Sequence, residues 1–493
     1  RPGIYSVRVT LAGFLPALER HVRIEPNLTT ILRVELDSVF TSIDRLRRQS
    51  RDKSEADEWG WVLRASSATR PVLRWADGEV LEGSAPSQAE SRSRRGARGR
   101  VELTSGARRP GSVSNVVDAP ATSIAYDLPI GRTQRLLFSG EASYDHSAAA
   151  GFATLWLPSG EIGRGPQTTL VLRRTELGSS GMLFRGARLD HSNTLRLGDH
   201  IAFRYGSEFI LVGMGHSTYS LRPRGEFLLH MAPGWQASLT VSPRPFNSPE
   251  LPASGLESAV LALDAFPAVL MRNAHPVIEG GWHDELAVER QLGPNTRLIA
   301  SVFRDRSRHT AVFGRGTAGD RDFLQDFFSR AFAYDGGASE AIGSRFAYRQ
   351  KLPEGVEMDV VYSWAGALVP DALASTALLR DALRTQHRHS FAARVSGRVP
   401  RAGTLISASY KWVNGRAASR QDPFGETLYQ LDPYLNIRLR QPLPSFFFPG
   451  KVEALADFRN LLAQGYIPVN TADGQVVLVA AFRSFRGGFS FQF

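Results

Sequence analysis

The last nine residues of the chain alternate between aromatic side chains and polar or small ones. Phe485, Phe489, Phe491 and Phe493 share one parity with Gly487, and the other parity holds serine, arginine, glycine and glutamine. Alternate side chains of a β-strand point to opposite faces, so this stretch predicts a strand with one aromatic and one polar face. Such a strand fits an antiparallel sheet packed against a second layer, or a barrel wall with lipid outside and water inside.

The same alternation persists from about residue 119 onward, and charged side chains recur on the second face at several depths. A dry core would not accept those charges unpaired, whereas a water-filled lumen would. No run approaches the roughly 18 apolar residues of a membrane helix, so any membrane role must use strands. Two of the strands, at 356–364 and 404–412, each end in a Tyr-x-Trp pair, comprising Tyr362, Trp364, Tyr410 and Trp412.

Short turns and long connections alternate strictly through the C-terminal half. Turns rich in proline and glycine are expected at 232–234, 293–295, 352–355 and 400–403, and long connections at 244–274, 307–340, 366–386, 414–428 and 459–475. Outer-membrane barrels have this arrangement, with short periplasmic turns and long external loops. In this phase the two Tyr-x-Trp pairs form an outer aromatic girdle. Segments 251–266 and 320–332 have helical apolar spacing, which predicts helices. Packing of these helices on neighbouring loops is favoured over the alternative of a lid or ligand platform at the barrel mouth.

We therefore predict an all-β protein whose main domain, residues 119–493, is a transmembrane antiparallel β-barrel. Counting strands from about residue 132 gives about sixteen, in a range of roughly fourteen to eighteen. Short alternating strands in residues 1–37 predict a fragment of a small β-sandwich. Residues 38–118 are expected to be a periplasmic linker, partly disordered, because they include the arginine-rich tract 91–100.

The net charge of +11 comes almost entirely from arginine. Such an excess suits nucleic acid or lipid phosphates. No aromatic residues interleave the arginine tract, so a nucleic-acid partner is not expected. Cysteine is absent, which excludes disulfides and thiolate metal sites.

Both ends of the chain resemble known families. The opening Pro2-Gly3-Ile4-Tyr5-Ser6-Val7, with Gly13-Phe14 and the closing Arg33-Val34-Glu35-Leu36, resembles the end of a carboxypeptidase-regulatory-like domain. Residues 434–440 and 451–461, with Gln464-Gly465-Tyr466, resemble the closing strands of TonB-dependent-receptor barrels. The aromatic end of the chain resembles the assembly signal of bacterial outer-membrane barrels. That resemblance assigns Phe489, Phe491 and Phe493 to recognition by the barrel-assembly machinery.

Receptors of that class have about twenty-two strands and a plug domain. The space between the first module and the barrel is too short and linker-like for a full plug, so a plug is expected to be lacking. An energy-coupling partner cannot be assigned from this sequence.

Two histidine patterns in the sequence are candidates for chemical sites. His387 and His389 would share one strand face as a metal pair, but no third ligand is evident in the sequence. His283-Asp284-Glu285 resembles part of an acid/histidine hydrolytic site, without an evident nucleophile. We therefore expect no catalytic, cofactor or metal site.

The sequence favours a receptor-like or transporter-like barrel of the bacterial outer membrane, with its N-terminal part in the periplasm. It would bind or pass an unidentified solute without covalent chemistry and contact outer-membrane lipid and lipopolysaccharide. One alternative is a structural or adhesive barrel that binds partners through its long loops. A second alternative is a soluble, arginine-rich β protein that binds polyanions.

Overall fold

The computed structural model describes the following residues: 3–9, 17–24, 98–106, 121–131, 134–143, 150–158, 165–177, 182–246, 266–315, 322–326, 331–370, 374–375, 379–400, 402–429, 431, 434–444, 450–462, 466–470, 475–480 and 483–493. The chain divides into two compact units, Arg1–Val62 and Leu63–Phe493. In the first unit, β1 (Gly3–Val9) and β2 (Ala17–Ile24) form an antiparallel pair. The third strand expected in this unit, at 30–36, lies outside the described residues.

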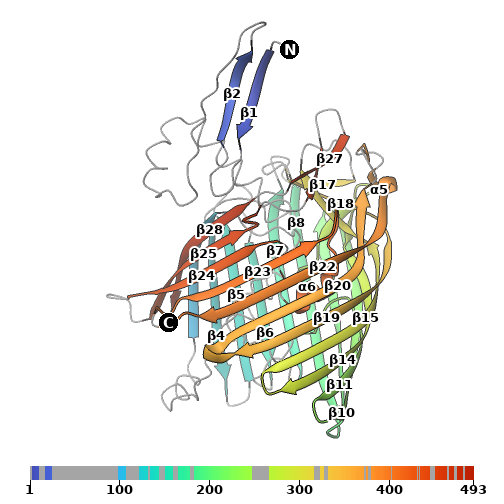
Figure 1. Ribbon diagram of the computed structural model, residues 1–493, viewed down its shortest axis with the longest axis vertical. Helices are drawn as coiled ribbons and strands as arrows, with labels where there is room; N and C mark the ends of the chain where they lie inside the picture. Colours follow the sequence, from blue (N-terminus) through green and yellow to red (C-terminus); the bar gives the residue numbers. More distant parts are fainter. Residues whose placement is uncertain are drawn as a thin grey trace. The chain divides into compact units, whose positions relative to one another are not determined.

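Among the described residues of the second unit, eighteen antiparallel strands form a closed barrel (Figure 1). They are β3 (Arg98–Gly106), β4 (Ala121–Ile130), β5 (Gln134–Ser143), β6 (Ala150–Leu157), β7 (Gln167–Leu177), β8 (Met182–Leu197), β9 (Ile201–Met214), β10 (His216–Ala232), β11 (Trp235–Ser242), β14 (Gly280–Gly293), β15 (Thr296–His309), β19 (Ser339–Leu352), β20 (Val356–Pro370), β22 (Leu383–Arg398), β23 (Leu405–Val413), β24 (Asn436–Leu443), β25 (Lys451–Arg459) and β28 (Ser484–Gln492). Each strand pairs with its neighbour along the chain, and β28 pairs with β3 to close the barrel. The predicted all-β barrel is confirmed.

The barrel begins earlier than the sequence pattern indicated. Strand β3 lies within residues 38–118, which were expected to be a linker, and it includes arginines of the 91–100 tract. Arg100 is buried on the lumen side, where its guanidinium pairs with Glu102 and donates to Ser490 at 3.0 Å. Since β3 and β4 both precede residue 132, they account for the two strands beyond the expected sixteen.

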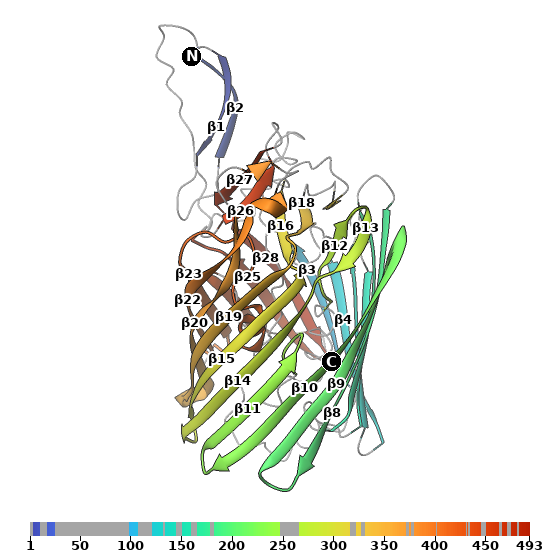
Figure 2. The same ribbon diagram turned by 90° about the vertical axis from the view of Figure 1, so that its right-hand side faces the viewer.

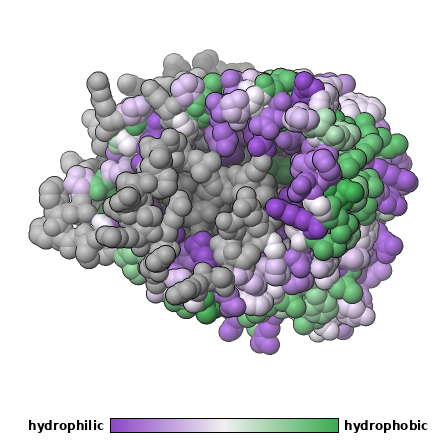
Figure 3. All heavy atoms as spheres, turned by 90° about the horizontal axis from the view of Figure 1, so that it is seen from below, coloured by the Kyte–Doolittle hydropathy of each residue, from purple (hydrophilic) through white to green (hydrophobic). Residues whose placement is uncertain are grey.

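The wall has an apolar outer face and a largely polar inner face. On β9, Phe203, Phe209 and Leu211 are exposed, whereas the intervening Glu208 and Ile210 are buried toward the lumen. Large exposed hydrophobic residues recur in the same way on strands around the whole barrel, and they gather on parts of its outer surface (Figure 3). Such a belt is what a strand wall facing lipid requires. Among the described residues, no helix combines the length and apolar character needed to cross a membrane.

The connections differ sharply between the two ends of the barrel. At one end, which we call the turn end, tight turns join the strands, such as residues 233–234, 294–295 and the 3₁₀ turn η1 (Pro353–Gly355). At the other, the loop end, longer connections carry extra elements (Figures 1 and 2). These are β12 (Val269–Arg272), β13 (His275–Ile278), β16 (Ala311–Arg315), β17 (Phe323–Asp326), β18 (Ala331–Asp335), β21 (Ala374–Ser375), α5 (Leu379–Ala382), α6 (Pro423–Leu428), β26 (Tyr466–Asn470) and β27 (Gln475–Ala480). The predicted alternation of short and long connections in the C-terminal half is confirmed.

Segment 320–332 is not the expected helix in the parts that the structure describes, residues 322–326 and 331–332. It contains β17 and part of β18, which join β16, β26, β27 and β21 in a six-stranded sheet. The rings of Phe323 and Phe332 meet edge to face with their centres 5.0 Å apart, and Phe323 also stacks on Tyr334. Apolar spacing alone cannot separate helix from strand in so short a segment, and here cross-strand aromatic packing prevails. Of segment 251–266, only Phe266 is described.

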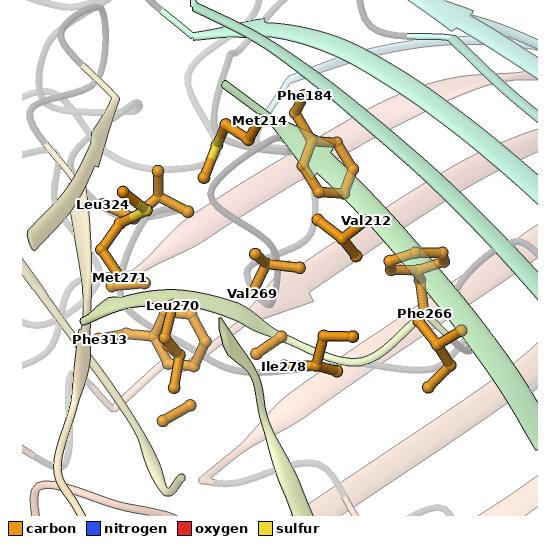
Figure 4. Packing of buried hydrophobic residues seen from close by; sticks show 14 of the residues in the cluster. Phe184, Val212, Met214, Phe266, Val269, Leu270, Met271, Ile278, Phe313 and Leu324 are labelled. Carbon is orange, nitrogen blue, oxygen red and sulfur yellow. The ribbon is translucent and has the colours of Figure 1, made fainter. Parts of the chain in front are cut away.

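Two of the long connections fold into the barrel. The β12–β13 hairpin packs its apolar side chains, including Val269, Leu270 and Ile278, against inward-facing residues of β8 and β9 (Figure 4). Phe266, just before the hairpin, meets Phe184 edge to face with the ring centres 6.0 Å apart. The connection that contains α6 packs against the inner faces of strands on another part of the wall, described below.

Candidate solute-binding lumen

Arg345 holds the α6 connection against the lumen wall. It lies on the inner face of β19, and its Nε and Nη2 atoms donate to Asp422 Oδ2 and Oδ1 at 2.8 and 2.6 Å. Its Nη1 atom donates to Glu285 Oε1 on β14 at 2.7 Å. Only 3% of Arg345 and 2% of Asp422 is exposed. A bidentate arginine–carboxylate ion pair that is buried in this way fixes the orientation of both groups.

Asp422 also begins α6. Its carboxylate accepts from Gly425 N at 2.9 Å, its backbone adopts a left-handed φ of 54°, and Pro423 occupies the first turn. The Ser363 hydroxyl of β20 donates to the same carboxylate at 2.8 Å. Burial by itself would raise the pKa of Asp422, but the Arg345 guanidinium outweighs it and holds the pKa well below its usual range. Asp422 is therefore ionised whenever the connection is in place at neutral pH.

A second ion pair fixes the other side of α6. Lys411, on the inner face of β23, donates to Gln421 O at 2.9 Å and to Glu426 Oε1 at 2.6 Å. Arg420 Nε donates to the other oxygen of Glu426 at 2.6 Å. After the helix, the buried ring of Tyr429 faces the Arg349 guanidinium, 5.7 Å from the ring centre. Burial raises the pKa of the Tyr429 hydroxyl, so it stays neutral.

His283 is a structural member of this site. Its ring stacks on Phe424 of α6 with the ring centres 3.7 Å apart. Its Nδ1 atom lies 2.6 Å from Asp305 Oδ1 and its Nε2 atom 2.8 Å from Glu285 Oε2. If both nitrogens of His283 carry a proton, the imidazole can donate one hydrogen bond to Asp305 and one to Glu285. Neither nitrogen is then free to act as a general base, which argues against the hydrolytic interpretation of this motif.

A third group of charges, which we call the arginine cluster, lines the wall near β8 to β11. It contains Arg173, Arg188, Arg222, Arg224, Arg244, Asp190, Glu208 and Glu279. Arg188 donates to Glu208 at 2.6 Å and to Asp190 at 3.2 Å, and Arg224 and Arg244 both pair with Asp190. The described residues of this cluster comprise five arginines and three carboxylates, a formal excess of two positive charges within the cluster.

The predicted lumen charges are thus present but not freely hydrated. They are buried against one another and against the inward-folded connections. Sequence alternation identified the inward face, but it could not identify the partners. The one local signal for α6 was Asp422-Pro423, an N-cap followed by proline, within a stretch assigned only as a loop. Within the part of the chain that the structure describes, no three metal-ligating side chains converge to hold an ion.

The Tyr-x-Trp residues lie on the outer face of the wall. Tyr362 and Trp412 are exposed, Tyr362 Oη lies 2.7 Å from His389 Nδ1, and the Trp364 ring stacks on His387 with the ring centres 4.3 Å apart. The two histidines therefore share one face, as the sequence predicts. Their contacts are with the aromatic residues that were expected to form the outer girdle, and Tyr410 on the same face is partly exposed.

The final phenylalanines also face outward. Phe489 and Phe493 are exposed and Phe491 is partly exposed. The backbone of Phe493 exchanges two hydrogen bonds with Gly99 of β3, at 2.8 and 3.0 Å. The last residue of the chain therefore extends the contact between the first and last strands of the barrel.

A closed antiparallel wall with lipid-compatible side chains outside and paired charges inside defines the class of transmembrane β-barrels. No family model and no curated protein matches the sequence. Among solved structures, the chain is similar to the siderophore receptor PirA from Pseudomonas aeruginosa (10% identity, 83% of this chain and 81% of that one, TM-score 0.36). It is also similar to the FrpB iron transporter from Neisseria meningitidis (8% identity, 80% of this chain and 81% of that one, TM-score 0.36). A third similar structure is the ferric-catecholate import receptor Fiu from E. coli K12 (10% identity, 81% of this chain and 82% of that one, TM-score 0.34). At TM-scores this low the similarities carry no functional argument, which depends instead on the barrel and its lumen.

Proposed function

We propose that this chain is a bacterial outer-membrane β-barrel of the receptor or transporter type, which binds or passes a solute without covalent chemistry. The observation that carries the proposal is the closed wall, apolar outside and charged inside, whose external connections fold into the lumen. Inward loops narrow a bore that eighteen strands would otherwise leave wide. They are suited to selecting what enters it.

The solute is proposed to carry negative charge. The arginine cluster has two more arginines than carboxylates, and its guanidinium groups come from several adjacent strands. Clefts lined by one sign of charge concentrate ligands of the opposite sign. Arg224 also lies 4.6 Å from the centre of the Phe246 ring, which adds an aromatic surface beside the charge.

The first test asks whether the barrel forms in the outer membrane. We expect the chain to need detergent for extraction and to change its gel mobility on boiling, as closed barrels do. The second test measures ion selectivity in a planar bilayer under a KCl gradient. Arg224→Gln with Arg244→Gln should lower the preference for chloride over potassium several-fold, whereas Arg304→Gln on the outer face should not. A parent chain that refolds to a monodisperse β protein in plain buffer would refute the membrane assignment.

A structural or adhesive barrel is the second candidate. The six-stranded sheet at the loop end is assembled from three separate connections, which makes it a stable platform for a binding partner. A heat-modifiable barrel that neither conducts ions nor binds anions would favour this candidate. The exposed apolar belt weighs against the third interpretation, a soluble polyanion-binding protein.

The remaining assignments belong to the same proposal. Phe489, Phe491 and Phe493 serve assembly through the barrel-assembly machinery, and Tyr362, Trp364, Tyr410 and Trp412 form the outer girdle. Residues 1–37 are a periplasmic β-sandwich fragment joined to the barrel by a linker.

A further inference from the structure

Two arginines stand directly opposite each other on the outer face of the barrel. Arg174 of β7 and Arg185 of β8 are cross-strand partners, and both are exposed. Residues paired in this way have Cβ atoms only about 5 Å apart, and like charges so placed destabilise a sheet. Neither guanidinium has an ion pair or hydrogen bond among the described residues. Within the described part of the wall, two repelling charges therefore stand side by side with no counter-charge bound to either.

Their height on the wall is well defined. Arg174 lies three residues before the end of β7 and Arg185 three residues after the start of β8, both close to the loop end. The next outward row toward the turn end is apolar, with Leu172 paired to Ala187 and Ala187 paired to Leu211. The two charges therefore mark the upper boundary of the apolar belt, where lipid headgroups meet hydrocarbon.

The surroundings leave space for a ligand. In the same row, Arg185 pairs with Gly213 of β9, which in turn pairs with Ser217 of β10, so the flank has only small side chains. Glu176, two residues beyond Arg174 on the same face, is the nearest outward carboxylate on this strand, and it forms no ion pair with either arginine. Among the described residues, two guanidinium groups without a partner therefore lie beside a row of small side chains.

Two other outward arginines near the loop end, both on β15, are neutralised by the protein. On β15, Arg304 Nε donates to Glu340 Oε1 at 2.6 Å, and Arg306 Nη2 donates to Asp284 Oδ2 at 2.5 Å. Those arginines have carboxylate partners on neighbouring strands. Arg174 and Arg185 have none among the residues that the structure describes, so their charge can meet an external anion.

We propose that Arg174 and Arg185 bind a headgroup phosphate of an anionic glycolipid of the lipid A type in the outer leaflet. Guanidinium forks match the geometry of phosphate oxygens, and a phosphate between the two arginines would turn their repulsion into attraction. The adjacent row of Leu172, Ala187 and Leu211 would contact the acyl chains of the same molecule. The inference rests on the proposed membrane location of the barrel, but it is independent of what the lumen carries.

The test uses the full-length chain, purified in detergent and shown to be folded by its boiling-induced mobility shift. Binding of diphosphoryl lipid A is measured by native mass spectrometry. Replacing both residues, Arg174→Gln and Arg185→Gln, should weaken binding about thirtyfold, since a near-surface arginine contributes about a fivefold factor. The matched control, Arg304→Gln with Arg306→Gln, removes two outward arginines that are already paired and should change binding by less than about twofold.

Two further measurements sharpen the result. Lysine at both positions keeps the positive charge but lacks the bidentate guanidinium group. Its affinity for diphosphoryl lipid A is therefore expected to lie between those of the parent chain and the glutamine variant. Dephosphorylated lipid A should bind the parent chain as weakly as diphosphoryl lipid A binds the glutamine variant. Unchanged lipid A binding in the glutamine variant, or equal displacement by inorganic phosphate alone, would overturn the proposal. A parent chain without a mobility shift would instead refute the proposed function, so the two failures are distinguishable.

Discussion

The ion pair between Arg345 and Asp422 should control whether the α6 connection stays in the lumen. The perturbation is Asp422→Asn, which removes the charge but keeps a good N-cap residue, so α6 itself should survive. Since the chain contains no cysteine, Ser363→Cys provides a single reporter thiol at a position only 2% exposed beneath Asp422. A reagent can reach this thiol when the connection leaves the wall.

The magnitude follows from what Arg345 loses and keeps. Breaking a buried ion pair by removing one partner costs about 3–5 kcal/mol. Arg345 keeps Glu285 at 2.7 Å, and its guanidinium remains 4.8 Å from the centre of the Phe303 ring, so the lower end applies. About 3 kcal/mol corresponds to roughly a hundredfold rise in the population of the released connection. Thiol modification limited by that opening should accelerate by the same factor.

The assay measures the rate of reaction of the Ser363→Cys chain, reconstituted in vesicles, with a water-soluble organomercurial reagent. Asp381→Asn is the control, because it removes an exposed carboxylate from another loop-end connection and leaves the α6 site intact. We expect the rate to rise about a hundredfold with Asp422→Asn and to stay unchanged with Asp381→Asn. Equal rates in the parent and in Asp422→Asn would refute the claim that this ion pair holds the connection in place.

Three further outcomes are expected. While the α6 connection is held against the wall, the pKa of Asp422 lies far below its usual range, and it returns to about 3.9 once the connection is released. Its contribution is therefore complete above about pH 4 and declines as the pH falls further, so thiol modification should accelerate in acid in the parent but not in Asp422→Asn. Gly488→Ala should reduce the heat-modifiable fraction, because a Cβ there would lie 2.2 Å from the Leu103 carbonyl oxygen across the closing strand pair, whereas Gly140→Ala meets nothing nearer than 3.9 Å. Phe493→Ala should lower the yield of assembled barrel several-fold in membrane fractions, and a normal yield would contradict its role in assembly.

The wall was predictable because its two faces differ in chemistry along each strand. The expected strand at 404–412 corresponds to β23, Leu405–Val413. The strand expected at 356–364 continues to Pro370 in the structure. Ala365, Gly366 and Ala367 belong to this extension, and because none of them is polar, the sequence there lacks the alternation that predicts a strand. Strand β3 was missed for a different reason. Its arginines resemble a solvated tract until the lumen partners of Arg100 are known, and those partners include Ser490 of the closing strand β28 and Glu102 of β3 itself.

The lumen explains why the long connections are concentrated in the C-terminal half. Wall side chains cannot by themselves fill a barrel of this width. Without Asp422 and Glu426 of the α6 connection, inward-facing Arg345 would keep only Glu285 and Lys411 would lose its carboxylate partner. Elsewhere on the wall, the apolar inward residues Phe184 of β8 and Ile210, Val212 and Met214 of β9 are covered by the apolar β12–β13 hairpin. Each connection matches the chemistry of the wall that it covers, so an inward charge at a strand position implies a counter-charge in a loop. The search for such counter-charges would have located α6 from Lys411 and the acidic residues that follow it.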